Sequence, residues 1–190
     1  MPATLQPKKT ILDKKQFRRV VRRIAGEVLE RDDAGDLLLV GIRTRGVPFA
    51  ERLAAEIAAM EGVEVPVGVL DITLYRDDLS TIAPQPVVRA SRFPVPLDGR
   101  VVVLADDVLY TGRTIRSALD ALIDYGRPRA VRLAVVVDRG HRELPIQADF
   151  VGQVVPTGKD EVVEVRFTET DGAEDVRILG WTGARVEAPS

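Results

Sequence analysis

The chain has 190 residues, of which 45% are hydrophobic and 29% charged, and its formal net charge is −2. This length suits one domain over residues 1–190, and the slightly acidic balance excludes a protein whose whole surface attracts nucleic acid. The absence of cysteine excludes disulfides and zinc–thiolate sites, and the longest apolar runs are too short to cross a membrane. We therefore expect a cytoplasmic globular protein with no membrane partner.

The first predicted element is a helix that begins after Asp13, which suits its N-cap, and ends near Glu30. Residues 1–10, before it, are predicted to be a loose tail. Faces of this helix away from its apolar stripe carry four arginines: Arg18, Arg19, Arg22 and Arg23. Such a set is ordinarily a solvated surface, and the functional alternative is contact with RNA or with another subunit.

A strand–loop–helix unit follows. Leu37–Val40 predicts a buried strand, and a helix is predicted from Pro48 to about Met60. The loop between them, Gly41–Gly46, is a candidate anion site because it leads into a helix N-terminus. Its two glycines have the spacing of a nucleotide-triphosphatase phosphate loop, but Val47 and Pro48 occupy the positions of the required Lys and Ser/Thr. That class of site is therefore excluded.

The next strand is predicted at Val65–Leu70, and the polar stretch 71–94 after it is too long for an ordinary connection. A second strand–loop–helix unit begins at Val101. Asp106 and Asp107 stand at the carboxyl end of this strand, and a Thr/Gly/Thr loop leads into an amphipathic helix from Ile115, with Gly126 as its predicted C-terminal cap.

The central unit predicts a phosphate site beside an acidic pair. Backbone N–H groups at the helix start, with the hydroxyls of Thr111 and Thr114, can donate to phosphate oxygens. Asp106 and Asp107 would repel a phosphate, so they must face sugar hydroxyls or a divalent cation. A ligand with a terminal phosphate, a ribose and a second charged group fits this order.

The remaining pattern predicts the fold class. Val131–Val137 is a further strand, so strands and helices alternate, which is typical of an α/β fold with a mainly parallel sheet flanked by helices. Ligands of such folds bind at the carboxyl ends of the strands, where both loops lie. After Asp138 the chain changes to short β-like segments: Phe150–Val151, Val162–Phe167 and Val176–Leu179.

The stretch from Val101 to Thr114 resembles the phosphoribosyl pyrophosphate (PRPP) motif of type I phosphoribosyltransferases. Neighbouring segments resemble one family in that class, the bifunctional pyrimidine-operon regulators with uracil phosphoribosyltransferase activity. These segments are Gly41–Gly46, Val67–Leu79 and Val137–Ile146. The resemblance implies a type I fold with a small β-rich hood at about 139–165 and a flexible loop at 71–94 that closes over PRPP.

The resemblance also implies site residues. Catalytic roles fall to Arg45, Asp106 and Asp107, and Tyr75, Arg76 and Asp77 are candidates to close the site from the flexible loop. A non-proline cis peptide is expected near Arg43. The PRPP-binding residues are Thr44, Arg45, Asp106, Asp107, Val108, Leu109, Tyr110, Thr111, Gly112, Arg113 and Thr114. The implied cofactor is Mg²⁺, held through PRPP, because no cluster of protein ligands is visible.

The base side is expected at Arg139 and His141. His141 is the only histidine, so zinc clusters and Ser-His-Asp triads lack their parts. Alone, this histidine would be a solvated loop residue, whereas Arg139 lies just past a strand end and can stack on a pyrimidine. Tyr110 stands where several related transferases carry a carboxylate, and tyrosine is typical of the resembled family.

The implied activity is the conversion of uracil and PRPP to UMP and pyrophosphate, together with UMP- or UTP-dependent binding of pyr operon leader mRNA and transcription attenuation. DNA is not an expected partner, and a homodimer or tetramer is expected. Three positions depart from the RNA-binding members, which commonly carry His, Arg and Lys at Gly26, Gln147 and Gln153. An enzyme without RNA regulation is therefore one alternative. A purine or orotate transferase is another, and a nucleotide sensor without catalysis is a third that the intact motif disfavours.

Overall fold

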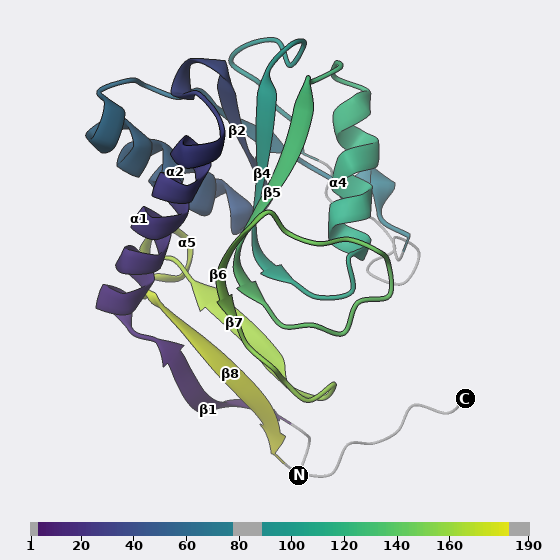
Figure 1. Ribbon diagram of the computed structural model, residues 1–190. Coiled ribbons are helices and arrows are strands. Elements are labelled where there is room, and N and C mark those ends of the chain that lie inside the picture. Colours follow the sequence, from purple (N-terminus) through teal and green to yellow (C-terminus); the bar gives the residue numbers. More distant parts are fainter. Residues whose placement is uncertain (1–3, 78–88, 183–190) are drawn as a thin grey trace.

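The computed structural model describes residues 4–77 and 89–182. Its main sheet has five strands in the order β3-β2-β4-β5-β6, and every neighbouring pair is parallel (Figure 1). The strands are β2 (Leu37–Ile42), β3 (Val67–Leu70), β4 (Val101–Leu109), β5 (Ala130–Asp138) and β6 (Phe150–Val154). The predicted α/β class with a mainly parallel sheet is confirmed.

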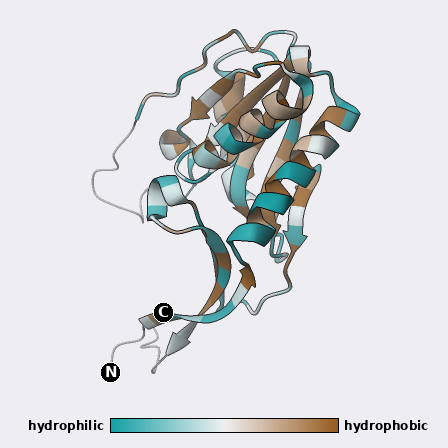
Figure 2. Cartoon of the chain, turned by 90° about the vertical axis from the view of Figure 1, so that its left-hand side faces the viewer, coloured by the Kyte–Doolittle hydropathy of each residue, from teal (hydrophilic) through white to brown (hydrophobic). Residues whose placement is uncertain are grey.

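Helices cover both faces of this sheet (Figures 1 and 2). The helices α1 (Lys14–Arg31) and α2 (Gly46–Glu61) lie on one face, and α4 (Arg113–Ile123) lies on the other. Because both faces are covered, β2 is buried along its whole length, as the continuous apolar run predicted. Short 3₁₀ turns occur at η1 (Ala34–Asp36) and η2 (Thr73–Tyr75).

The start of α1 is fixed by local hydrogen bonds. The Asp13 carboxylate accepts the backbone N–H of Gln16 at 2.8 Å, and the Gln16 side chain accepts the backbone N–H of Asp13 at 2.9 Å. This reciprocal pair is a capping box, which satisfies two donors that a helix start leaves unpaired. The predicted cap at Asp13 is confirmed.

A second sheet lies below the first and is antiparallel, with the order β1-β8-β7. It consists of β1 (Thr4–Leu12), β7 (Val162–Arg166) and β8 (Asp175–Thr182), and the short helix α5 (Thr168–Asp171) joins β7 to β8. Inner side chains of this small sheet, such as Val165 and Val176, share one hydrophobic core with α1 and α2. The small sheet is therefore packed on the main one through common side chains.

Three expectations require correction. The predicted loose tail at 1–10 is wrong for its described part, because Thr4–Leu12 pairs with β8. The predicted hood at 139–165 is only partly correct, because Phe150–Val154 is the edge strand of the main sheet while β7 belongs to the small one. The helix before Gly126 ends earlier than predicted, with Asp124 as its cap. Strand pairing between distant segments, which local periodicity does not encode, causes the first two errors.

Candidate active site

Two loops predicted to bind anions lie at the same edge of the sheet. Strands β2 and β4 are hydrogen-bonded neighbours, so the loop after Ile42 and the loop after Leu109 both leave from their carboxyl ends. Gly46 lets α2 begin directly against β4, because a Cβ there would collide with the carbonyl oxygen of Ala105. The Arg43–Thr44 peptide bond is cis, as expected. The structure therefore brings the two predicted loops together.

The loop after β4 opens into the start of α4. Gly112 has φ 94°, a left-handed conformation that favours glycine, and α4 begins at the next residue. The first N–H groups of α4 have no partners within the helix and, with the positive end of its dipole, favour a bound anion. The Thr111 hydroxyl accepts the Arg113 backbone N–H at 3.4 Å. This geometry suits a phosphate.

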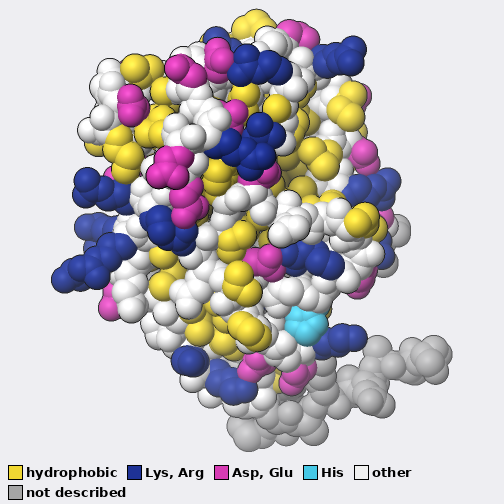
Figure 3. Space-filling model, in the orientation of Figure 1, with side chains coloured by type: hydrophobic (Ala, Val, Ile, Leu, Met, Phe, Trp, Pro, Cys, Tyr) yellow, Lys and Arg dark blue, Asp and Glu magenta, His cyan; other side chains and the backbone are white. Residues whose placement is uncertain are grey.

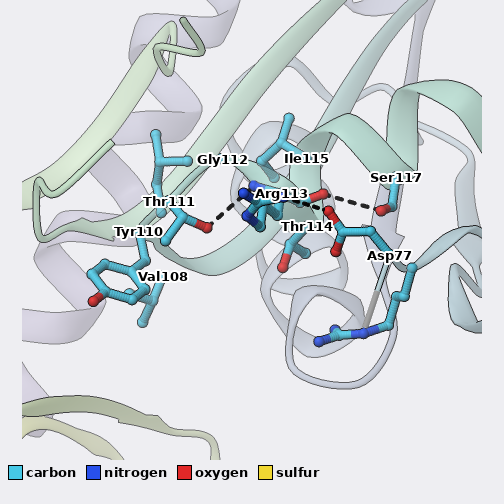
Figure 4. A pocket seen from close by; sticks show the side chains of 11 residues that line it. Asp77, Val108, Tyr110, Thr111, Gly112, Arg113, Thr114, Ile115 and Ser117 are labelled. Atoms are coloured by element: carbon cyan, nitrogen blue, oxygen red, sulfur yellow. Dashed lines mark hydrogen bonds and ion pairs between the residues drawn. The ribbon is translucent and has the colours of Figure 1, made fainter. Parts of the chain in front are cut away.

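A cavity of about 590 Å³ lies over this loop (Figure 4). Asp77 reaches across it to Arg113, whose guanidinium donates to Asp77 at 2.6 Å and to Glu143 at 2.7 Å. The lining residues are Arg76, Asp77, Val108, Leu109, Tyr110, Thr111, Gly112, Arg113, Thr114, Ile115 and Ser117. Most of the predicted PRPP run therefore lines one cavity, with Arg76 and Asp77 from the predicted closing loop.

The described residues of the predicted closing loop contribute unequally. Tyr75 donates its hydroxyl to Asp124 at the end of α4 and so is directed away from the cavity that Arg76 and Asp77 line. Asp71 accepts the backbone N–H of Thr73 at 2.8 Å and of Arg89 at 3.0 Å, which fastens both described ends of the loop. Residues 78–88 of the predicted loop lie outside the described residues.

The acidic pair lies within β4 rather than after it, because the strand continues to Leu109. Asp106 is 7% exposed, and its carboxylate accepts the backbone N–H of Asp107 at 3.0 Å. Burial, and then the neighbouring Asp107 charge, raise the pKa of Asp106 well above its ordinary value. Burial also raises the pKa of Asp107, although Val108 and Arg45 oppose this. Such a pair favours hydroxyl donors or a cation beside it.

Arg45, the last residue before α2, is held by a partner that the sequence did not predict. Its Nε and Nη2 donate to the two carboxylate oxygens of Asp171 at 3.2 and 2.7 Å. Asp171 lies on α5, 126 residues further along the chain. The hydrogen bond from Arg45 lowers the pKa of Asp171 and keeps it ionised. No local pattern in the sequence indicates this pair.

The two predicted base-side residues lie together beside Tyr110. The Arg139 guanidinium lies 4.1 Å from the Tyr110 ring centroid, and the His141 ring is 5.8 Å from the same centroid. Arg139 is buried and donates to the Thr157 hydroxyl and the Gly158 carbonyl, both at 3.0 Å. A ring nitrogen of His141 is 2.7 Å from the Thr157 carbonyl oxygen. This cluster forms a wall with an aromatic face.

Arg142, which sequence reasoning missed, ties this wall to the phosphate loop. Its guanidinium pairs with Asp138 at the end of β5 and donates to the carbonyl oxygens of Tyr110 and Ile146, both at 2.8 Å. The backbone N–H groups of Glu143 and Leu144 donate to the Thr111 carbonyl. The segment after β5 and the loop after β4 are therefore fixed to each other.

All four arginines of α1 are exposed, and Figure 3 shows Lys and Arg side chains on several parts of this face, among them the side on which α1 lies in Figure 1. Two of them already have protein partners: Arg18 donates to Glu174 at 3.1 Å, and Arg23 pairs with Glu27 and donates to the Val151 carbonyl. Arg22 is 4.0 Å from Glu56. A side chain added at Gly26 would meet open space on this flank. The arrangement leaves exposed positive charge, chiefly near Arg19 and Arg22.

Neither a metal cluster nor a membrane-spanning helix is found in the described part of the chain. Among residues 4–77 and 89–182, no three His, Asp or Glu side chains are grouped to hold a metal ion. In the same ranges no helix combines the length and the apolar character that crossing a bilayer requires.

Comparison with known proteins agrees with this geometry. Residues 7–168 match the phosphoribosyl transferase domain family. The chain is 58% identical over 174 residues to Bifunctional protein PyrR of Deinococcus radiodurans, covering 91% of this chain and 95% of that one. It is 61% identical over 173 residues to Bifunctional protein PyrR of Pelotomaculum thermopropionicum, covering 90% and 96%.

A solved structure shows the same fold at low identity. The hypoxanthine phosphoribosyltransferase of Trypanosoma cruzi superposes with a TM-score of 0.70 at 16% identity, covering 92% of this chain and 97% of that one. Fold and sequence thus agree on the type I phosphoribosyltransferase fold. The chain belongs to the phosphoribosyl transferase family and, within it, to the bifunctional PyrR proteins.

Proposed function

We propose that this protein transfers the 5-phosphoribosyl group of PRPP to N1 of uracil, which gives UMP and pyrophosphate, and that it also regulates pyrimidine biosynthetic genes. The observation that supports the transferase activity is that two predicted anion-binding loops and an acidic pair lie toward the carboxyl ends of the neighbouring strands β2 and β4. An aromatic wall at Tyr110 and Arg139 lies next to them. This arrangement supports adjoining sites for the phosphate, ribose, pyrophosphate and base.

Each residue's role follows from its position. The N–H groups at Thr111–Thr114 bind the 5′-phosphate, and Thr44 and Arg45 hold the pyrophosphate. Asp106 and Asp107 accept hydrogen bonds from the ribose hydroxyls and stabilise positive charge that develops on the sugar. The C1′–O bond to pyrophosphate breaks, the N1–C1′ bond forms, and the N1 proton of uracil is released to solvent. Tyr110, Arg139 and His141 orient the base. Arg76 and Asp77 limit the access of water to the cavity, because water would otherwise hydrolyse PRPP.

The residues present fit Mg²⁺ bound together with PRPP. Asp106 and Asp107 offer the oxygen ligands that this ion prefers, and burial of their charges favours a cation nearby. When bound, Mg²⁺ offsets the charge of the leaving pyrophosphate. Most of its ligands would come from PRPP and water, since the described residues lack a dedicated cluster.

RNA binding is the second activity, with pyr leader mRNA as the partner and UMP or UTP as the effector. The supporting observation is the basic flank of α1, a local positive surface on a chain whose net charge is −2. The protein is proposed to act in the cytoplasm, as a homodimer or tetramer. Gly26, Gln147 and Gln153 reduce the groups available for RNA, so this activity is tested separately.

One experiment separates the alternatives. Transferase assays with uracil, orotate and hypoxanthine are run beside a titration with the leader RNA. Uracil is expected to be the accepted base, and replacing Asp106 and Asp107 together with Asn is expected to abolish UMP formation while the circular dichroism spectrum is retained. Near wild-type turnover in that variant would contradict the roles proposed for Asp106 and Asp107. Turnover without saturable RNA binding at low salt would show that the protein is a transferase without RNA regulation.

A further inference from the structure

The short helix α5 is fastened to α2 at two places. Arg45 immediately precedes α2 and Arg52 lies within it, seven positions or about two helical turns further on. Arg45 holds Asp171 through two hydrogen bonds. Arg52 donates to both carboxylate oxygens of Glu169 at 3.0 and 2.8 Å, and to Glu174 at 2.9 Å.

The position of α5 does not depend on Arg45. Besides its three hydrogen bonds, the Arg52 guanidinium lies over the rings of Phe17 and Phe167, at 5.5 and 5.1 Å from their centroids. Phe167 is fully buried and immediately precedes α5. Asp171 also accepts the backbone N–H of Phe167 at 3.0 Å, which fixes its carboxylate. A rigid element thus presents Asp171 to Arg45.

The geometry leaves the rest of the Arg45 guanidinium available. A guanidinium carries five N–H bonds in a planar fork, and the pair with Asp171 uses one on Nε and one on Nη2. The edge formed by Nη1 and Nη2 can still donate in parallel to two oxygens of a phosphate. Arg45 is about a third exposed, so without Asp171 its long side chain would have many rotamers open to it.

We propose that Asp171 is a positioning residue for Arg45: it fixes the guanidinium so that its second edge faces the pyrophosphate of the substrate. This inference rests on the proposed transferase function. Asp171 itself touches neither reactant. Because Arg45 is already fixed, its side chain loses less conformational freedom when pyrophosphate binds, and the affinity for pyrophosphate is higher. The small sheet, through α5, would thereby contribute to binding the leaving group.

The test uses two Asp171 variants and a matched control. Asp171→Asn removes the charge, and Asp171→Glu retains it. Asp175→Asn is the control, because Asp175 forms a similar two-bond pair with Arg166 in the same small sheet. The KM for PRPP, kcat, the affinity for pyrophosphate by calorimetry in Mg²⁺ buffer, and the melting temperature are measured for each full-length variant.

We expect Asp171→Asn to raise the KM for PRPP and weaken pyrophosphate binding on the order of tenfold, the usual size of coupling between contacting residues. The change in kcat should be much smaller, because ground-state and transition-state binding are lost together. Asp171→Glu should recover part of the loss. Asp175→Asn should bind pyrophosphate like the wild type, even if both Asn variants melt at similarly lowered temperatures.

A double-mutant cycle separates positioning from a structural role. In an Arg45→Gln background, Asp171→Asn should add no further loss of pyrophosphate affinity, because the group that it positions is gone. Additive losses, or equal losses from Asp171→Asn and Asp175→Asn, would overturn the proposal. If the wild type binds pyrophosphate but makes no UMP, the proposed transferase fails, and the pyrophosphate measurements still decide the role of Asp171.

Discussion

At the scale of single residues, Asp106 and Asp107 place two carboxylates where burial opposes their charge. Burial raises both pKa values, and the Asp107 charge raises that of Asp106 further. The folded protein therefore holds these protons more tightly than the unfolded chain does. As the pH rises from the ordinary carboxyl range through the raised pKa of Asp106, the free energy of unfolding must fall. Keeping these two carboxylates at this place thus lowers the stability of the ligand-free protein at neutral pH.

Replacing Asp106 with Asn should therefore stabilise the ligand-free protein at neutral pH. We expect a gain of about 1 kcal/mol in the free energy of unfolding, typical when a strained functional group is removed. The gain should shrink as the pH is lowered toward the ordinary carboxyl range, where the wild-type side chain is protonated. Urea denaturation over a pH series measures this. Asp120→Asn, which changes a half-exposed carboxylate on α4, should show no such gain, and a destabilised Asp106→Asn would contradict the argument.

Residue identities in the site were predictable where chemistry follows directly from chain order. Asp106, Asp107 and Thr111 follow an apolar run and precede a helix, so the sequence was enough to bring the acidic pair and the loop before α4 together in one prediction, and the phosphate there stays a prediction. The partners of these groups were not predictable in the same way. Asp171 meets Arg45 across 126 positions, and Arg142 reaches the Tyr110 carbonyl across 32. Such pairings are settled by tertiary packing, and an arginine or aspartate in the sequence does not specify its partner.

At the scale of elements, the loop between β4 and α4 is held in one conformation by Gly112 and its neighbours. A Cβ at Gly112 would lie 3.4 Å from the Cβ atoms of Leu144 and Ile146, and its φ of 94° is unfavourable for other residues. The loop is thus set by backbone conformation and by the segment after β5. A phosphate, sulfate or nucleotide 5′-phosphate in a ligand-bound crystal should therefore lie against Thr111–Thr114.

Gly112→Ala should weaken PRPP binding. The left-handed conformation costs a residue with a Cβ roughly 1–2 kcal/mol, and relief of that strain would redirect the N–H groups that hold the phosphate. We expect the KM for PRPP to rise about tenfold, which corresponds to roughly 1.4 kcal/mol. Steady-state kinetics measures it. Gly99→Ala serves as the control, because Gly99 also has a positive φ but nothing lies within 4 Å of its added Cβ. Equal effects of the two variants on KM would argue against a special role for the loop.

A second glycine has the opposite expectation. Gly26 lies inside α1 with helical backbone, and a Cβ there would meet nothing within 4 Å. Gly26→Ala should therefore raise the free energy of unfolding by about 0.5–1 kcal/mol, because glycine loses more backbone freedom than alanine in a helix. Thermal and urea denaturation test this, and transferase kinetics should remain unchanged. A loss of stability would show that the backbone at Gly26 is not ordinary helix.

Elements with a clear apolar period were predicted within a few residues. The helix after Asp13 and the strands at Leu37, Val101 and Val131 carry their own evidence in the spacing of buried side chains. β1 could not be found this way. The side chains of Thr4–Thr10 are exposed, and the segment is ordered by its hydrogen bonds to β8. β6 was recognised as β-like, but the sheet it joins is decided by pairing with β5.

At the scale of the whole molecule, charge is distributed unevenly. The net charge is −2, yet α1 presents exposed arginines on one flank (Figure 3). Long-range attraction of RNA by the whole field is therefore weak, and any affinity must come from this flank. Arg18 and Arg23 donate hydrogen bonds to protein groups, whereas Arg22 has a long ion pair with Glu56 at 4.0 Å. Arg19 and Arg22 should therefore make the larger contribution.

RNA binding should consequently depend steeply on salt. Log affinity for the leader RNA should fall linearly with log salt concentration, with a slope of about −0.7 per phosphate neutralised in a single strand. Replacing Arg19 and Arg22 with Gln should weaken binding and make the slope less steep. Arg129→Gln, which removes a charge paired with Asp36 elsewhere, is the control. An unchanged slope in the double variant would place the RNA on another surface.

Effector dependence adds a thermodynamic check on the same titration. UMP should tighten RNA binding and PRPP should oppose it. Because linkage is reciprocal, RNA must tighten UMP binding by the same factor that UMP tightens RNA binding. Titrations of each ligand in the presence and absence of the other measure both factors, and unequal values would show that the two measurements do not report one equilibrium.

The pairing of β1 with β8 also has a consequence for synthesis of the chain. Thr4 and Thr182 hydrogen-bond to each other 178 positions apart, so β1 is synthesised long before its partner β8. Until then β1 is an unpaired strand edge, which invites pairing with other chains. Pro7 offers no backbone N–H, and Lys8 and Lys9 bring like charges to any second copy. We therefore expect these three residues to disfavour pairing of β1 with another chain before β8 has been made.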